Sequence, residues 1–160
     1  MCRLNIQKEV LIISVPTYRR SLSGTEYVWQ VRQLAVRVGE IVANRSKKYK
    51  GIYSDKIISL SINAVSEVIL ANEIYVKTQS DYENRRAHLL KAKGCLWSML
   101  TISDIFLEQV KKSPPDSKES KAKRDEKISK QQLELGSAVD ECVKLINGVI
   151  KSDIKRYSNL

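Results

Sequence analysis

Glycine and proline are scarce in this sequence, with six and three residues among 160. β-Sandwiches and barrels join many short strands through tight turns that use both residue types, so the composition disfavours them. The chain also lacks any apolar run near the about 18 residues that cross a membrane, so we expect no transmembrane helix and no membrane partner. A short apolar run, Val10–Ile13, is followed by Pro16 and Arg19-Arg20 rather than by a cleavage site, and secretion is not expected.

Residues that assemble catalytic or metal sites are also few. His88 is the only histidine, no Glu-x-x-His occurs, and the neighbouring Arg85 and Arg86 disfavour a protonated His88. The three cysteines have no CxxC spacing, and no glycine-rich phosphate loop is present. We therefore predict a non-enzymatic protein without metal or cofactor, in which His88 is an exposed helix side chain. Cys95 and Cys142 lie on apolar helix faces, where reduced thiols fit a cytoplasmic protein.

Apolar residues recur every three or four positions over four stretches, at about 25–45, 55–77, 80–112 and 128–157. This spacing predicts amphipathic helices, each with one face to bury. Four such helices with three connections favour an all-α fold, an antiparallel up-down-up-down four-helix bundle. Residues 1–24 then form an N-terminal arm, and 25–160 form the bundle.

Local signals place the helix ends and some contacts. Ser80 and Glu83 have capping-box spacing at the start of the third helix. The Ser- and Lys-rich segment 113–127 has almost no apolar residue, which predicts a mobile linker within the bundle domain. Asn63 and Asn72 interrupt the apolar second helix and are expected to bond to a neighbouring helix. Isolated glycines are expected to permit close helix approach: Gly39, Gly94, Gly136 and Gly148.

Positive charge is in excess, with 28 Lys and Arg against 18 Asp and Glu, a net charge of +10. Such a field favours phosphate-rich partners such as RNA and DNA, although the charge can also serve solubility alone. One cluster has Tyr49 and Tyr53 interleaved with five cations: Arg45, Lys47, Lys48, Lys50 and Lys56. Tyrosine rings stack on unpaired bases, and equally a basic loop can be solvated while its tyrosines cap the bundle end.

A second cluster lies in the third predicted helix: Arg85, Arg86, Lys91 and Lys93. Asp81 and Glu83 stand at helical pair spacing to Arg85 and Arg86 and offset part of this charge. Nucleic-acid binding and a solvated face are both open here. The third cluster, within 118–127, alternates with acids and is interpreted as solvated linker.

Two segments carry a family resemblance. Arg85–Leu96 resembles the third helix of the four-helix-bundle proteins encoded in 23S ribosomal RNA intervening sequences, and Leu145–Ser152 resembles their closing helix. The wider similarity runs from about Glu26 to Lys155. The basic stretch from Val31–Arg37 to Tyr49 is more similar to one branch, the accessory variability determinants of diversity-generating retroelements.

The resemblance implies a pentameric ring that binds RNA and DNA and associates with a retroelement reverse transcriptase during mutagenic retrohoming. It brings no catalytic residue. The alternative is a structural or protein-interaction bundle of the same family, with incidental positive charge. The aromatic residues Tyr27, Trp29, Tyr75 and Trp97 are candidates for the subunit interface. The candidate nucleic-acid-binding residues are Arg32, Arg37, Arg45, Lys47, Lys48, Lys50, Arg85, Arg86, Lys91 and Lys93.

Overall fold

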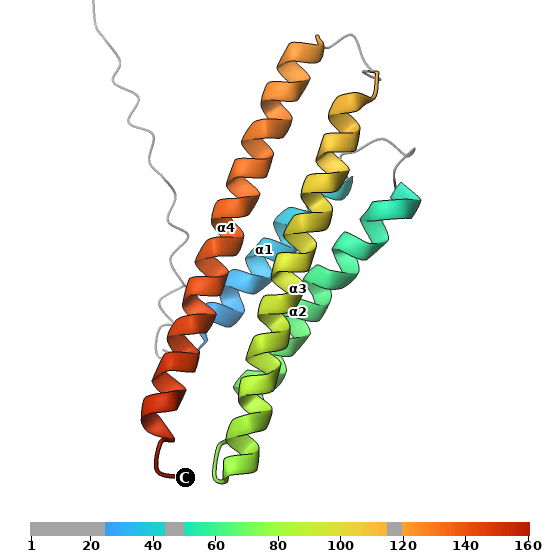
Figure 1. Ribbon diagram of the computed structural model, residues 1–160. Helices are drawn as coiled ribbons and strands as arrows, with labels where there is room; N and C mark the ends of the chain where they lie inside the picture. Colours follow the sequence, from blue (N-terminus) through green and yellow to red (C-terminus); the bar gives the residue numbers. More distant parts are fainter. Residues whose placement is uncertain (1–24, 44–49, 115–119) are drawn as a thin grey trace, which may run out of the picture.

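The computed structural model describes residues 25–43, 50–114 and 120–160 (Figure 1). They form four long helices and one short π-helical segment, without a strand among them. The helices are α1 (Glu26–Ala43), α2 (Asp55–Glu73), α3 (Gln79–Lys112) and α4 (Lys121–Arg156), and the π-helical η3 (Lys50–Ser54) precedes α2. Successive helices run in opposite directions (Figure 1), so the predicted all-α four-helix bundle is confirmed. The predicted arm at 1–24 lies outside the described residues.

The helices follow one another around the bundle. The α2–α3 contact is the most extensive, followed by α3–α4 and α1–α2, and α1–α4 is the least extensive contact between neighbouring helices. With 34 and 36 residues, α3 and α4 are nearly twice as long as α1 and α2, which have 18 and 19. At about 1.5 Å of rise per residue, they continue as a two-helix hairpin beyond the four-helix core.

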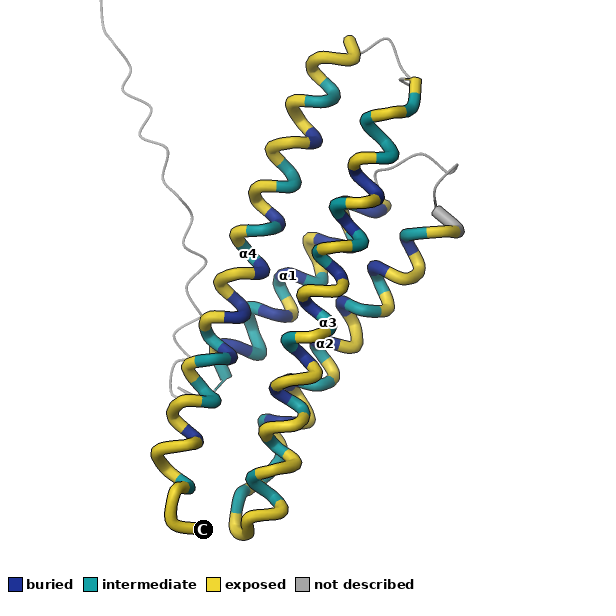
Figure 2. The backbone as a smooth tube through the Cα atoms, viewed as in Figure 1, coloured by how far each residue is buried: buried dark blue, intermediate teal, exposed yellow. Residues whose placement is uncertain are grey.

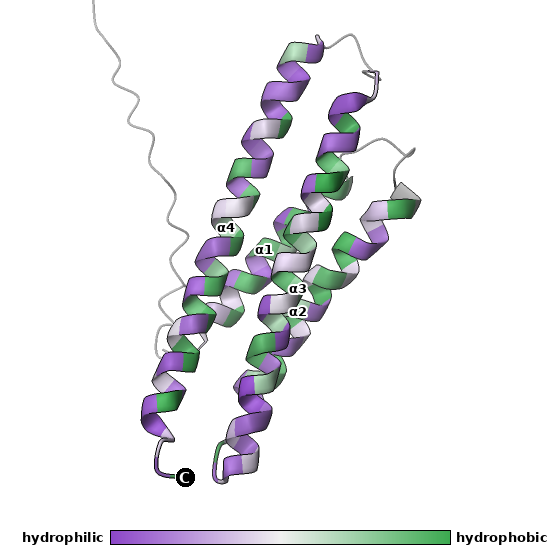
Figure 3. Ribbon diagram, viewed as in Figure 1, coloured by the Kyte–Doolittle hydropathy of each residue, from purple (hydrophilic) through white to green (hydrophobic). Residues whose placement is uncertain are grey.

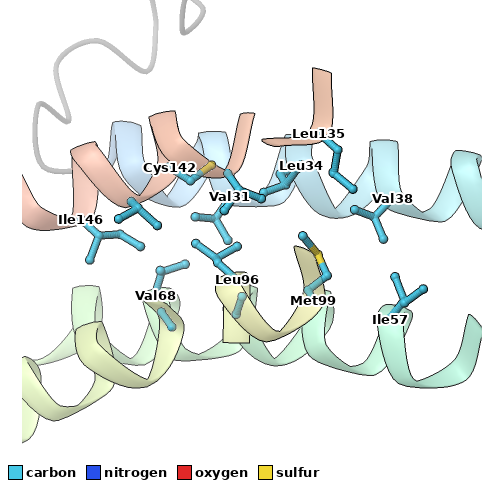
Figure 4. Packing of buried hydrophobic residues seen from close by; sticks show 14 of the residues in the cluster. Val31, Leu34, Val38, Ile57, Val68, Leu96, Met99, Leu135, Cys142 and Ile146 are labelled. Carbon is cyan, nitrogen blue, oxygen red and sulfur yellow. The ribbon is translucent and has the colours of Figure 1, made fainter. Parts of the chain in front are cut away.

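Each helix buries the face that its apolar spacing defines (Figure 2). Figure 4 shows Val31 and Leu34 of α1 facing Leu96 and Met99 of α3 across the interior, with Val38 opposite Ile57 of α2. The predicted stripe of α3 is buried throughout: Leu89, Ala92, Leu96, Met99, Ser103 and Phe106. Hydrophobic and hydrophilic residues alternate around each helix (Figure 3), and none of the described helices has an apolar stretch long enough to cross a membrane.

The first turn of α3 is capped two residues earlier than the sequence predicted. Thr78, not Ser80, is the N-cap: its hydroxyl accepts from the Asp81 amide, and Asp81 Oδ2 accepts from the Thr78 amide at 2.9 Å. The predicted Ser80–Glu83 box is therefore wrong. Thr78 is favoured because its extended backbone (φ −127°, ψ 163°) aims the hydroxyl at the first turn.

The predicted linker 113–127 is wrong over its second half, because α4 begins at Lys121. Ser120 caps this helix, and Arg124 Nη2 donates to the Lys111 carbonyl at 2.9 Å, which joins the start of α4 to the end of α3. Ile128, one turn after Arg124, is fully buried. Lys, Ala, Arg and Glu are good helix formers, so this polar segment needs only these contacts to extend α4.

The helical glycines do not mark close helix contacts. No atom of a neighbouring element lies within 4 Å of the position that a Cβ would take at Gly39, Gly94, Gly136 or Gly148, so this prediction is wrong. Cysteine was predicted correctly: Cys142 is buried and Cys95 half-buried. Burial raises the pKa of Cys142 to about 12, so this thiol packs as a small apolar group.

Candidate nucleic-acid interface

Most cations of the first basic cluster are not among the side chains that the structure describes. Arg45, Lys47 and Lys48 lie outside the described residues, and the Lys50 side chain is not described either. Tyr53 is half-buried, with its ring centroid 5.9 Å from that of Phe106 and its side chain against the core. That contact fits a tyrosine that caps the bundle end, and it leaves the ring poorly placed to stack on a base.

Arg85 is turned into the bundle. Its Nε donates to Asp153 Oδ2 at 2.6 Å, and its Nη1 donates to the Ala71 carbonyl, so one guanidinium joins α2, α3 and α4. The Arg85 side chain is 14% exposed and that of Asp153 is 7% exposed. A guanidinium already bonded on the inside is not available to a phosphate, so we leave Arg85 out of the interface.

Tyr27 extends this internal network. Its hydroxyl lies 3.5 Å from both the Val68 carbonyl and Asn72 Oδ1, and burial is the main cause that raises its pKa. Asn72 thus makes the interhelical bond that its position predicted, whereas Asn63 is exposed. Because Tyr27 is 2% exposed, it belongs to the core and not to a subunit interface, which corrects the sequence-based interpretation.

The two arginines of α1 do not share a surface. Arg32 and Arg37 are both exposed, but five residues of helix turn them about 140° apart. Arg37 lines a groove between α1 and α4 together with Glu40 and Glu134, whose carboxylates disfavour a bound phosphate. Because α1 contacts α2 and α4, its arginines do not join the basic residues of α3.

On α3 the structure brings two of the predicted cations together. Arg86, Leu90, Lys93 and Trp97 follow one another at four, three and four residues, which places them in one stripe along the helix. Arg86 and Leu90 are exposed, Lys93 is half-exposed and Trp97 is 43% exposed. Lys91 is exposed on another side of the helix, about 160° around from Lys93.

Two lysines of α4, which sequence reasoning missed, lie beside this stripe. Asp153 pairs with Arg85 and Gln132 with Lys111, so the antiparallel register sets Lys151 level with Arg86 and Lys144 level with Lys93. Both lysines are exposed. We call Arg86, Leu90, Lys93, Trp97, Lys144 and Lys151 the α3–α4 face. The seven-residue spacing of Lys144 and Lys151 was the available signal, but the register that aligns them with α3 was not.

The acids around the α3–α4 face limit its extent. Glu83 lies on the same side of α3, one turn before Arg86, and Asp140 lies one turn before Lys144 on α4. Asp153, the nearest buried acid, is already paired with Arg85. The four cations therefore stand between acidic ends, so a bound strand has a defined length of surface to contact.

His88 is a contact between helices. Its Nδ1 lies 2.6 Å from Glu67 Oε2 of α2, and the two side chains are 25% and 21% exposed. The expectation of an exposed His88 is therefore wrong, because the α2–α3 interface reaches this side of the helix. Within the described ranges, no three His, Cys, Asp or Glu side chains gather in a way that could hold a metal ion.

Comparisons with protein-family models, with curated proteins and with solved structures returned no match. The resemblance to intervening-sequence proteins consequently stays a prediction. The fold, the charge and the α3–α4 face are the features that bear on function.

Proposed function

We propose that this protein is a non-enzymatic, RNA- and DNA-binding accessory protein that holds phosphates on its α3–α4 face. The observation that carries this proposal is a group of four cations on two adjacent helices, in which Arg86 is level with Lys151 and the half-exposed Lys93 is level with Lys144. Cations neutralise phosphates and release their counterions, which gives sequence-tolerant affinity. A net charge of +10 adds a long-range field that draws polyanions toward this face.

The proposed protein partner is a retroelement reverse transcriptase, with the protein holding template RNA or its cDNA near the polymerase. The support is the resemblance of Arg85–Leu96 and Leu145–Ser152 to the intervening-sequence bundle proteins, and of the basic stretch from Val31–Arg37 to Tyr49 to their retroelement accessory branch. The bundle fold agrees with this resemblance. The genomic neighbourhood tests this partner. A reverse transcriptase gene with paired template and variable repeats beside this gene supports it, and a locus without them contradicts it.

The alternative function is a protein-interaction bundle whose charge is incidental. The exposed apolar side chains of α2 favour it, since Ile62 is 55% and Ile69 is 39% exposed on one side of that helix. The two functions predict different effects of removing positive charges on nucleic-acid binding. Only the nucleic-acid function requires a particular set of cations.

The decisive comparison uses two double variants that each lose two charges. Arg86→Gln/Lys93→Gln alters the α3–α4 face, whereas Lys123→Gln/Lys127→Gln alters exposed cations at the far end of α4. In the first variant, the slope of log affinity against log salt for single-stranded RNA is expected to become shallower by up to about 1.4. Each phosphate contact contributes about 0.7 to that slope, and this variant loses two cations. The second variant is expected to keep the slope of the unmodified protein. Equal losses in both would show that binding follows net charge alone and would overturn the assignment of the face.

A further inference from the structure

We propose that Trp97 makes the α3–α4 face selective for single strands, by stacking its indole on an unpaired base while neighbouring cations hold the phosphates. This inference rests on the proposed function and deepens it. It assigns the base-stacking role to a tryptophan on α3 and not to Tyr53, whose ring packs against Phe106.

Trp97 is placed on the surface by the helix itself. Leu96 and Met99, its neighbours in sequence, are 1% and 0% exposed, so α3 turns that side to the core and Trp97 away from it. Thr101 Oγ1 donates to the Trp97 carbonyl at 2.9 Å within the helix. The Trp97 ring is 43% exposed on a rigid element, and tryptophan is enriched at binding interfaces because its body is apolar and its N–H is polar.

The surroundings of the ring hold cations on the side of Lys93 and one acid, Asp140, which the same register sets level with Trp97. Lys93 stands one turn before Trp97, about 6 Å along the helix axis, and Arg86 about 16 Å before it. Gly94, also one turn away, has no side chain, and no other element comes within 4 Å of the place of its Cβ. The surface next to the ring is therefore open on that side, where a base could lie.

A base can meet this ring only when it is unpaired. In a duplex the faces of the bases are stacked on one another, and a side chain on the outside reaches phosphates and base edges. An unpaired base exposes its face, and losing one base–aromatic stack weakens binding by about 5- to 150-fold. Charge argues against a two-fold contact between two copies of the chain through this face, since such a contact would set its cations against the same cations.

The test compares single-stranded and duplex RNA of equal length and sequence by fluorescence anisotropy, with the full-length protein. Trp97→Leu is expected to weaken single-strand binding by about 5-fold or more while duplex binding stays within about 2-fold. Trp97→Phe, which keeps a ring, is expected to retain more of the single-strand affinity. Tyr75→Leu is the matched control, because Tyr75 is 79% exposed at the α2–α3 connection, and it is expected to change neither affinity.

Three outcomes would overturn the inference. Equal losses of affinity for single strands and duplexes would show that Trp97 supports binding without distinguishing the two. Unchanged affinities would show that no base reaches the ring. A changed sedimentation mass with unchanged RNA affinity would place Trp97 in a subunit contact. The Arg86/Lys93 salt slopes are measured on the native tryptophan, so they test the proposed function separately.

Discussion

Arg85 and Asp153 form an ion pair between α3 and α4 that is largely shielded from water. Removing one partner of such a pair leaves an uncompensated charge in a poorly hydrated place, which costs about 3–5 kcal/mol. Arg85→Met is accordingly expected to lower the free energy of unfolding by about 3 kcal/mol in urea titrations. Arg85→Met/Asp153→Leu should recover most of that loss, because neither charge then remains.

Lys130→Met is the control for the charge itself. The Lys130 side chain is 76% exposed and lies 4.0 Å from Glu134, and exposed pairs of this kind contribute about 0–1 kcal/mol. A loss for Arg85→Met no larger than that for Lys130→Met would show that the internal pair does not stabilise the bundle.

Gly136 offers a gain in stability at a single residue. It lies in the middle of the 36-residue α4, and nothing stands within 4 Å of the position of an added Cβ. Gly136→Ala should therefore raise the free energy of unfolding by about 0.5–1 kcal/mol, because alanine loses less backbone freedom on forming a helix. Urea titration measures this gain. A loss of stability would indicate that a second subunit packs closely at this position.

Single residues also show where sequence reasoning stops. The partner that the sequence offered for Arg85 was Asp81, four residues away on the same helix, whereas the structure pairs it with Asp153, 68 residues away. Asp81 is instead used in the helix cap. Helical spacing predicts neighbours along one helix, but a contact between helices depends on rotation and register, which the spacing does not contain.

The start of α3 supplies a prediction about an element. Thr78→Ala removes the capping hydroxyl and should destabilise the protein by about 1 kcal/mol. Ser80→Ala, at the residue that the sequence favoured as cap, should leave the urea midpoint nearly unchanged. A larger loss for Ser80→Ala than for Thr78→Ala would contradict the observed cap.

The same cap carries a pH dependence. Hydrogen bonds from Thr78 and from the Lys77 amide lower the pKa of Asp81 below its usual 3.8. A carboxyl group with a lowered pKa in the folded state stabilises that state above its unfolded pKa, and this stabilisation is lost as pH falls through the folded-state value. Asp81→Asn should therefore be less stable than the unmodified protein at pH 6, and the difference should shrink below about pH 4. A difference independent of pH would contradict this role.

Among the elements, the strongly periodic ones were predicted best. The inward stripe of α3 followed from spacing alone, because its residues recur from Leu89 to Phe106, over about five turns. The start of α4 could not be found this way, since Lys121–Lys127 bury almost no apolar side chain. A hydrogen bond from Arg124 to the Lys111 carbonyl holds that segment, and such a tertiary contact has no sequence pattern that predicts it.

For the whole molecule, we propose a closed homo-oligomer, with a pentamer expected from the family resemblance. Exposed Ile62, Ile69 and Leu70 give α2 apolar surface beyond what the bundle buries. Sedimentation equilibrium at micromolar concentration should then give about five times the 18.2 kDa of one chain. Ile62→Lys/Ile69→Lys should lower that mass, since charges disrupt an apolar interface. A mass near 18.2 kDa for the unmodified protein would remove the ring.

The candidate site was predicted only in part at this scale. Sequence clusters grouped Arg85 with Arg86, yet the fold turns Arg85 inward to Asp153 and exposes Arg86. Lys144 and Lys151 could be assigned to the candidate site only from the α3–α4 register. Net charge predicts the class of ligand, because a long-range field needs no fold, whereas the surface that receives the ligand depends on which helices become neighbours.

The salt dependence of RNA binding tests the central claim most directly. Affinity for a single-stranded RNA of mixed sequence would be measured from about 50 to 200 mM salt. If the four cations of the α3–α4 face contact phosphates, the log–log slope should be about −2.8 or steeper, from about −0.7 per phosphate neutralised. A flat slope, or no binding at about 50 mM salt, would contradict the claim that this bundle binds nucleic acid through its charge.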